Sequence, residues 1–227
     1  MATPPPLTDA DRIRISDAVA AAEMHSAGEI VTILAERSDD YADIALAWSA
    51  LVAGLALMAL TIAPDFYLGL YDTLTGGWVH ERTPRAIFAV AAFVAMAKFA
   101  GMWLLQLWTP LRLLLVPGRV KSARTRARAV ACFRVGAERR THGRTGILIY
   151  LSMREHRAEI VADAAIAARV SPEVWGEAMA AMLAHIREDR IADGLVAAIG
   201  RVGQVLAANL PRADEDRNEL PDRVIEV

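Results

Sequence analysis

Two long stretches of the chain consist almost entirely of hydrophobic positions. The first, 44–62, reads IALAWSALVAGLALMALTI and contains no charged residue. At 1.5 Å per residue it makes a helix of roughly 28 Å, close to the bilayer's hydrocarbon thickness of about 30 Å. The second, 86–107, has a single charge, at Lys98. The two stretches predict a transmembrane hairpin with an external loop at 63–85.

The alternative for these stretches is a pair of helices buried in a large helical core. A core helix normally keeps a polar face at the 3.6-residue spacing, and 44–62 has none, which favours the bilayer. Lys98 lies near the middle of the second stretch, where an ionised amine is costly, so it is either part of a functional site or a neutral, snorkelling or oligomer-facing lysine. The first stretch supplies no acid to pair with it, which favours the second interpretation.

Cations beside the two stretches predict their orientation. The loop 63–85 contains only Arg82 and Arg85, whereas seven cations follow the second stretch: Arg112, Arg119, Lys121, Arg124, Arg126, Arg128 and Arg134. Because cations gather on the cytoplasmic side, we expect a multi-pass protein of the inner membrane with both termini in the cytoplasm. The basic segment 120–140 is expected to be a helix near anionic lipids. Nucleic acid is not expected, because Phe133 is its only aromatic residue.

Outside the hairpin, the pattern alternates between helices and strands. A helix is expected from Thr8 or Asp9 to Met24, followed by a β-branched strand at 29–34. A second strand at 147–152 and a partner beginning at Glu159 predict a hairpin. Neither a lone strand nor a lone hairpin is stable, so we expect one sheet assembled from both sides of the membrane insertion.

Two further helices and a tail complete the pattern. Ser171, followed by proline, indicates a helix start, and that helix is expected to run to Glu188. In the last helix, Ile191, Leu195, Ile199, Val202 and Leu206 form an apolar stripe that should pack on the sheet. The expected organisation is therefore a domain in two parts, 1–43 and 108–210, around an insertion at 44–107, with a loosely ordered acidic tail at 211–227.

Composition supports a membrane protein and excludes several other classes. Hydrophobic residues make up 55% of the chain, and the net charge of −2 gives no basic field for nucleic acid. A single cysteine, Cys132, excludes an intrachain disulfide and a thiol cluster for a metal. The first 14 residues lack the apolar stretch of an export signal, so insertion is expected to use the internal segments.

Several short motifs occur in an order that resembles the TPM domain family. They are Ala22-Glu23, Ser26 to Ile30, Gly146 to Ser152, Glu159 to Asp163, Ala192 to Leu195 and the ending Asn218 to Val227. The likeness extends to the membrane-inserted bacterial subgroup. It implies a three-layer α/β sandwich with a small central sheet and helices on both faces. Some members are described as acid phosphatases or calcium binders, and others act in photosystem repair or receptor assembly.

The resemblance also implies an acidic site. Its matching positions here are Glu29, Asp163 and Asp193, whose carboxylates would hold a divalent cation. Two departures count against calcium. The family often has a glycine after the acid, where this chain reads Asp163-Ala-Ala-Ile, and its domain is usually outside the cytoplasm.

No strong catalytic motif accompanies these acids. The chain contains no phosphate-cradling GxxxxGK[ST], no GxGxxG and no GxSxG. Asp163 and Asp193 are equally well explained as caps and first-turn charges of helices. Two hypotheses follow: an interaction or maintenance module for other membrane proteins, which we favour, and a divalent-cation-dependent phosphatase. The sequence leaves the partner, the substrate and the oligomeric state open.

Overall fold

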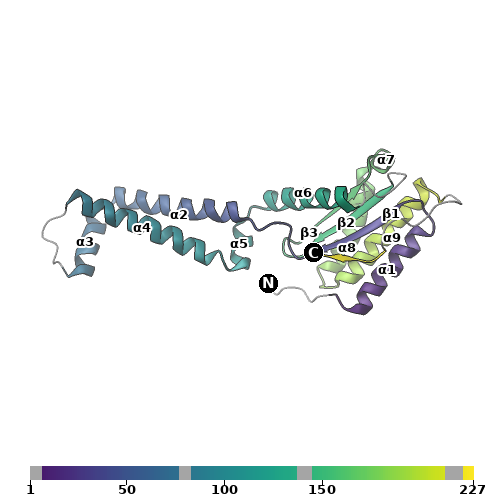
Figure 1. Cartoon of the computed structure of the whole chain (residues 1–227), viewed down its shortest axis with the longest axis horizontal. Coiled ribbons are helices and arrows are strands. Elements are labelled where there is room, and N and C mark those ends of the chain that lie inside the picture. The colour runs from purple at the N-terminus through teal and green to yellow at the C-terminus, as the bar shows by residue number, and fades with distance from the viewer. Residues whose placement is uncertain (1–6, 77–82, 137–144, 213–221) are drawn as a thin grey trace. The chain divides into compact units, whose positions relative to one another are not determined.

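The computed structural model divides the chain into two compact units, and it describes residues 7–76, 83–136, 145–212 and 222–227 (Figure 1). Unit 1 comprises residues 1–39 and 118–227, and unit 2 comprises residues 40–117. Each unit is described by itself below.

A four-stranded sheet with the order β3-β2-β1-β4 forms the centre of unit 1. The strands β1 (Glu29–Ala35) and β2 (Gly146–Ser152) pair in parallel, and β3 (Arg157–Ala162) pairs antiparallel with β2. Segments before and after the hydrophobic stretches thus share one sheet, as expected. The short strand β4 (Ile225–Glu226) pairs in parallel with β1, where the sequence predicts only a loosely ordered tail. The Val227 amide donates to the Leu34 carbonyl at 3.0 Å beside it.

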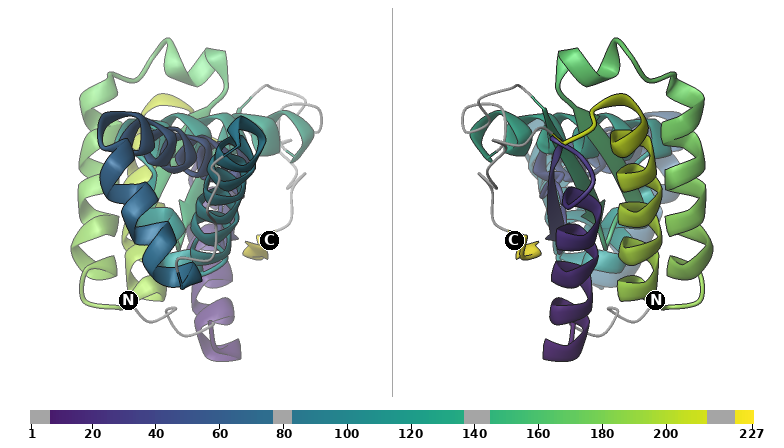
Figure 2. Two further views of the ribbon diagram at one scale, coloured as in Figure 1. Left: turned by 90° about the vertical axis from the view of Figure 1, so that its left-hand side faces the viewer. Right: turned by 90° about the vertical axis from the view of Figure 1, so that its right-hand side faces the viewer.

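Helices cover both faces of this sheet. One face packs Ile30, Leu34, Ile147 and Ile149 against α1 (Asp9–Glu23), α8 (Pro172–Ile186) and α9 (Ile191–Asn209). The other face packs Val31, Ile33, Leu148 and Tyr150 against Ala129 and Phe133 of α6 (Gly118–Gly136). Successive strand residues point to opposite faces, so each strand supplies both cores. The result is the expected three-layer α/β sandwich, seen in the right-hand view of Figure 2.

Local signals explain the helices of unit 1. Thr8 and Asp11 form a capping box at the start of α1, in which the Asp11 amide donates to Thr8 Oγ1 at 3.1 Å. The apolar stripe of α9 lies in the core, where Leu195, Ile199, Val202 and Leu206 are all 0% exposed. Ser171 precedes α8 as expected, but its side chain makes no capping bond to the helix backbone. A short helix, α7 (Ala164–Ala167), follows β3.

In unit 2, α2 (Ala42–Ile62) and α4 (Pro84–Leu105) pack against each other, and each contains most of one predicted membrane stretch. Buried Gln106, directly after α4, joins them: its Nε2 donates to the Ala45 carbonyl at 3.0 Å and to Ser49 Oγ at 3.2 Å. The segment 63–85 contains a helix, α3 (Pro64–Thr75), where only a loop was expected. Pro64 ends the first stretch in the sequence but also opens α3, since proline suits the first helical position. A short α5 (Thr109–Leu115) follows α4.

Three helices are long and apolar enough to cross a membrane among the residues described: α2, α4 and α9. Only 11% of the most apolar stretch of α2 and 0% of that of α4 is buried, against 50% for α9. Large side chains that would belong in a core are exposed on α2 and α4, among them Leu51, Leu55, Met58, Phe88, Phe93 and Met96. Lys98 is exposed on α4 as well.

Candidate functional site

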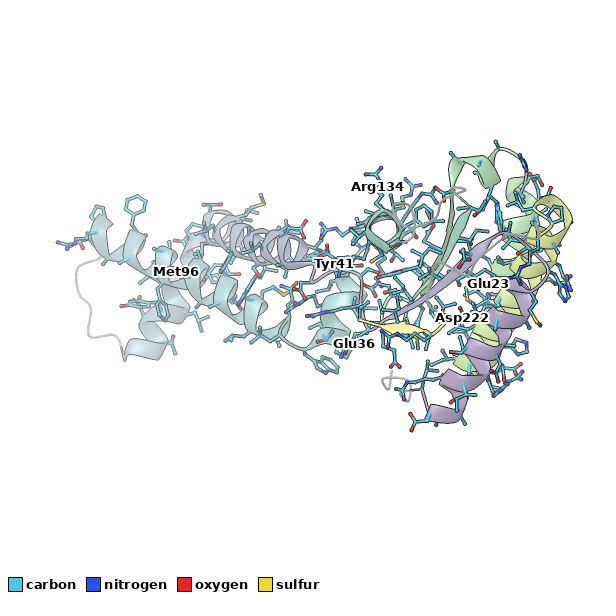
Figure 3. The ribbon with its side chains drawn as sticks, turned by 45° about the vertical axis from the view of Figure 1, so that its right-hand side comes forward. Glu23, Glu36, Tyr41, Met96, Arg134 and Asp222 are labelled. Carbon is cyan, nitrogen blue, oxygen red and sulfur yellow. The ribbon has the colours of Figure 1, made fainter. Side chains whose placement is uncertain are left out.

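An acidic cavity of about 190 Å³ lies where α1 ends and β1 begins. Its polar lining comes from Glu23 at the end of α1, Ser26 shortly after this helix, Glu29 at the start of β1, and Arg212 and Asp222 near the C-terminus. Figure 3 labels Glu23 and Asp222. We call the space between these five residues the acidic cavity.

Glu23 is the most perturbed group in this cavity. It continues the buried face of Ile15 and Val19 at four-residue spacing, and it is only 8% exposed. Burial raises the pKa of its carboxyl to about 8, the hydrogen bond from Ile30 opposes this shift, and the charge of Glu29 adds to it. In that bond the Ile30 amide donates to Glu23 Oε1 at 2.7 Å. Glu23 therefore anchors the start of β1 to the end of α1 and holds a proton near neutral pH.

Glu29 and Asp163 lie at the same end of the sheet. Glu29 is the register partner of Gly146. Both carboxylates are buried: Glu29 is 6% exposed and Asp163 is 5% exposed. The Gly146 amide donates to Asp163 Oδ2 at 3.0 Å, and the Asp163 amide donates to the Gly146 carbonyl at 3.0 Å. The side chain of Asp163 thus braces the start of β2, although Asp163 also occupies the N-cap position of α7.

Asp193 lies elsewhere, in the first turn of α9. It accepts hydrogen bonds from Arg14 at 2.5 Å and from Arg190 at 3.3 Å, and the Arg14 bond lowers the pKa of its carboxyl. Arg14 and Glu23 are nine positions apart on α1, which corresponds to about 13 Å of helix. The structure therefore brings together two of the three predicted acids, and it pairs the third with arginines at the other end of α1.

A divalent cation would need several oxygen ligands arranged around one point. Carboxylates of Glu23, Glu29 and Asp222 are the right type of ligand, and they line one cavity. Within the described residues, however, no three His, Cys, Asp or Glu side chains form a group that could hold a metal ion. The arrangement does not fit a metal centre, and we derive no chemistry through one.

Sequence reasoning missed Glu23 and Asp222 as members of this cavity. A signal for Glu23 was available, since it falls four residues after Val19 and eight after Ile15 on an otherwise apolar face. It also lies in the last turn of α1, where the helix dipole disfavours a negative charge. Asp222 carries no local signal, because its position depends on the path of the C-terminal segment.

A second polar cluster lies at the opposite end of β1 and β2. Glu155, 4% exposed, accepts the Ser38 amide at 2.8 Å and the Ser152 hydroxyl at 2.5 Å. Ser38 Oγ in turn lies 2.9 Å from Ser152 Oγ and 3.2 Å from the Tyr150 hydroxyl. These bonds satisfy a buried carboxylate and tie the segment after β1 to the turn after β2, which is a structural role.

Comparisons with known proteins agree with this fold. Unit 1 has the architecture of an α/β sandwich with an acidic cavity beside Glu29, at the N-terminal end of β1. Residues 114–205 match the family model described as TPM domain. The chain therefore carries a TPM domain, which confirms the family resemblance drawn from its sequence.

A solved structure shares the fold. It is the NMR structure of the BA42 protein from the psychrophilic bacterium Bizionia argentinensis, with a TM-score of 0.55 and 18% identity. The alignment covers 97% of this chain and 95% of that one. A comparison with curated proteins finds no match.

Proposed function

We propose that this chain is a multi-pass integral membrane protein whose TPM domain serves as an interaction or maintenance module for other membrane proteins. The proposal joins two observations: a TPM domain at 114–205, and an insertion whose helices α2 and α4 keep their apolar side chains exposed. The exposure carries the proposal. A water-soluble protein rarely leaves so large an apolar surface uncovered, whereas a bilayer covers it.

The distribution of cations supports a cytoplasmic position for the TPM domain. The segment 63–85 contains two Lys or Arg residues, Arg82 and Arg85, while α6 alone contains six such residues and no acid. Translocating α6 would move these cations across the membrane, against the positive-inside tendency. Both termini then belong to the cytoplasmic side of the inner membrane, and α3 to the external side.

The acidic cavity favours an interaction module over a divalent-cation-dependent phosphatase. A phosphate group entering it would meet the carboxyl groups of Glu23, Glu29 and Asp222 and one cation, Arg212. A covalent mechanism also needs a side-chain nucleophile, and the hydroxyl lining this cavity, Ser26, is 2% exposed and bonded to Gly28. Charge and access therefore both oppose the binding of a phosphate ester.

Two experiments test the membrane proposal. Membranes from cells expressing the chain are extracted with alkaline carbonate, and an integral protein stays in the pellet. A topology reporter is then fused after Gly76 and, separately, after Val227. We expect an external signal at Gly76 and a cytoplasmic one at Val227. Release by carbonate would refute membrane integration, and an external signal at Val227 would refute the orientation.

A third experiment tests the phosphatase alternative. The purified chain in detergent is assayed for phosphate release with magnesium or calcium, beside Glu29→Gln, Asp163→Asn and Asp193→Asn variants. We expect no cation-dependent activity above that of a blank. Activity that depends on the cation and falls in the Glu29→Gln or Asp163→Asn variant would support the enzyme and overturn the interaction module.

A further inference from the structure

The outer face of α6 is strongly basic. The helix contains six cations and no acidic residue. Its inner face packs on the sheet through Ala129 and Phe133, which are 0% and 6% exposed. Two of the six cations have acidic partners: Arg124 pairs with Asp39 at 2.8 Å and Arg126 with Glu159 at 3.1 Å. A third, Lys121, is half-buried.

Three exposed arginines are left for an external partner. Arg119, Arg128 and Arg134 make no ion pair with any residue that the structure describes. Figure 3 shows Arg134 extending from α6 away from the sheet. Between the arginines runs a ridge of exposed apolar residues spaced by four, Ala123, Ala127, Ala131 and Val135. Their small side chains leave the helix backbone close to whatever covers this face.

We propose that this face of α6 binds the anionic headgroups of the lipid bilayer. Arginine suits phosphate groups because its planar guanidinium donates two parallel hydrogen bonds. The long side chains flank the shallow ridge, so they reach headgroups while the ridge approaches the interface. Along the chain, α6 begins at Gly118, three residues after α5 ends and thirteen after α4, the second proposed membrane helix, ends. The inference rests on the proposed membrane function.

Thiol labelling of the full chain tests this contact. The native cysteine is removed by Cys132→Ala, and a reporter is placed on the ridge by Ala131→Cys. The protein is reconstituted in nanodiscs of phosphatidylcholine alone or of phosphatidylcholine with phosphatidylglycerol, and the rate of maleimide labelling is measured. We expect slow labelling in anionic discs, fast labelling in zwitterionic ones, and loss of the protection at high salt.

Matched variants identify the residues responsible. Replacing Arg119, Arg128 and Arg134 together by Gln should reduce the protection about a hundredfold, because each cation near an anionic surface contributes about fivefold in affinity. The control replaces Arg169, Arg187 and Arg201, exposed arginines of α7, α8 and α9 and the segments beside them, and should leave the protection unchanged. Equal labelling rates of all variants in detergent would show that the fold is intact.

Several outcomes would overturn the proposal. Equally slow maleimide labelling in both kinds of disc would exclude headgroup charge as the cause of protection. An equal loss of protection in the Arg169, Arg187 and Arg201 control variant would show that the effect is not specific to this face of α6. Protection that appears only on addition of an acidic protein or of nucleic acid would assign the face to that partner instead. Failure of the chain to enter discs at all, together with carbonate release, would refute the membrane proposal itself and is distinguishable from these results.

Discussion

Two helices that are both long and apolar, α9 and α4, have opposite surroundings. Half of the most apolar stretch of α9 is buried, and none of that of α4, although either could cross a bilayer by length and composition. In α9 the buried side chains form one stripe, and Arg201 and Gln204 lie exposed on the other side. In α4 the side chains from Ala86 to Leu105 are apolar on every side, and Lys98 is the single charged exception. The angular pattern of polar residues therefore distinguishes a helix that packs in a core from one whose apolar side chains stay exposed.

The largest expected effect comes from placing an acid in each helix. Ile199→Asp would put a charge where the side chain is 0% exposed, and should cost about 4 kcal/mol or more, enough to unfold unit 1. Phe93→Asp, on the exposed face of α4, should leave unit 1 folded and weaken membrane insertion by about 3 kcal/mol. Limited proteolysis of unit 1 and carbonate extraction measure the two effects. The same response from both variants would contradict the comparison.

Much of the fold follows from such patterns, because they are local. The periodicity of α9, the cap of α1 and the β-branched runs of β1 and β2 are each readable within a few residues. By contrast, β4 contributes only two residues, and its pairing with β1 depends on a contact across most of the chain. Pro64 is compatible both with the end of the helix before it and with the first position of α3, so its residue type alone does not predict α3.

The candidate site was less predictable than the fold. Glu29 and Asp163 are implied by the family resemblance alone, and their common position at one end of the sheet follows from the pairing of Glu29 with Gly146, whose amide donates to Asp163. Asp193 could not be placed, since its bond to Arg14 arises from how α1 and α9 pack, whereas its bond to Arg190 is local. Glu23 acquires its role from a tertiary hydrogen bond to Ile30, which no spacing rule reveals.

Close packing of α9 gives the next largest effect. A Cβ at Gly203 would lie 2.6 Å from the Ala22 Cβ of α1, so Gly203→Ala should push the two helices apart and cost about 1–3 kcal/mol. The same change at Gly200, where nothing lies within 4 Å, should stabilise the helix by about 0.5–1 kcal/mol. Thermal melting of the two variants in detergent distinguishes them. A shift of the same sign in both would mean that α1 and α9 do not pack this closely.

Glu23 should make the stability of unit 1 depend on pH. The folded state keeps a proton on this carboxyl up to a pKa of about 8, whereas the unfolded chain loses it near 4.5. The folded state therefore binds more protons between these values, and its stability falls as the pH rises through this window. Glu23→Gln removes the titration and retains an oxygen acceptor for the Ile30 amide. The variant should match the wild type at pH 4 and exceed it by about 1–2 kcal/mol at pH 9.

Urea titrations at the two pH values measure this difference. Glu177→Gln, on the exposed side of α8, is the control and should give parallel curves. A Glu23→Gln variant that loses stability equally at both pH values would show that the carboxyl acts only through its shape and hydrogen bond. That result would leave the acidic cavity without a titrating group near neutral pH.

The smallest change in stability is expected for the pairing of α2 with α4 in unit 2. Gln106 joins α2 and α4 through its bonds to Ala45 and Ser49, but in the described residues its buried Oε1 has no hydrogen-bond partner. Gln106→Leu removes the bonds and this unsatisfied atom together, so the hairpin should lose only about 0.6 kcal/mol, a typical value for polar contacts between membrane helices. An SDS titration followed by tryptophan fluorescence, combined with Ser49→Ala in a double-mutant cycle, measures it. A loss above about 2 kcal/mol would mean that polar contacts, rather than apolar packing and lipid, hold the hairpin together.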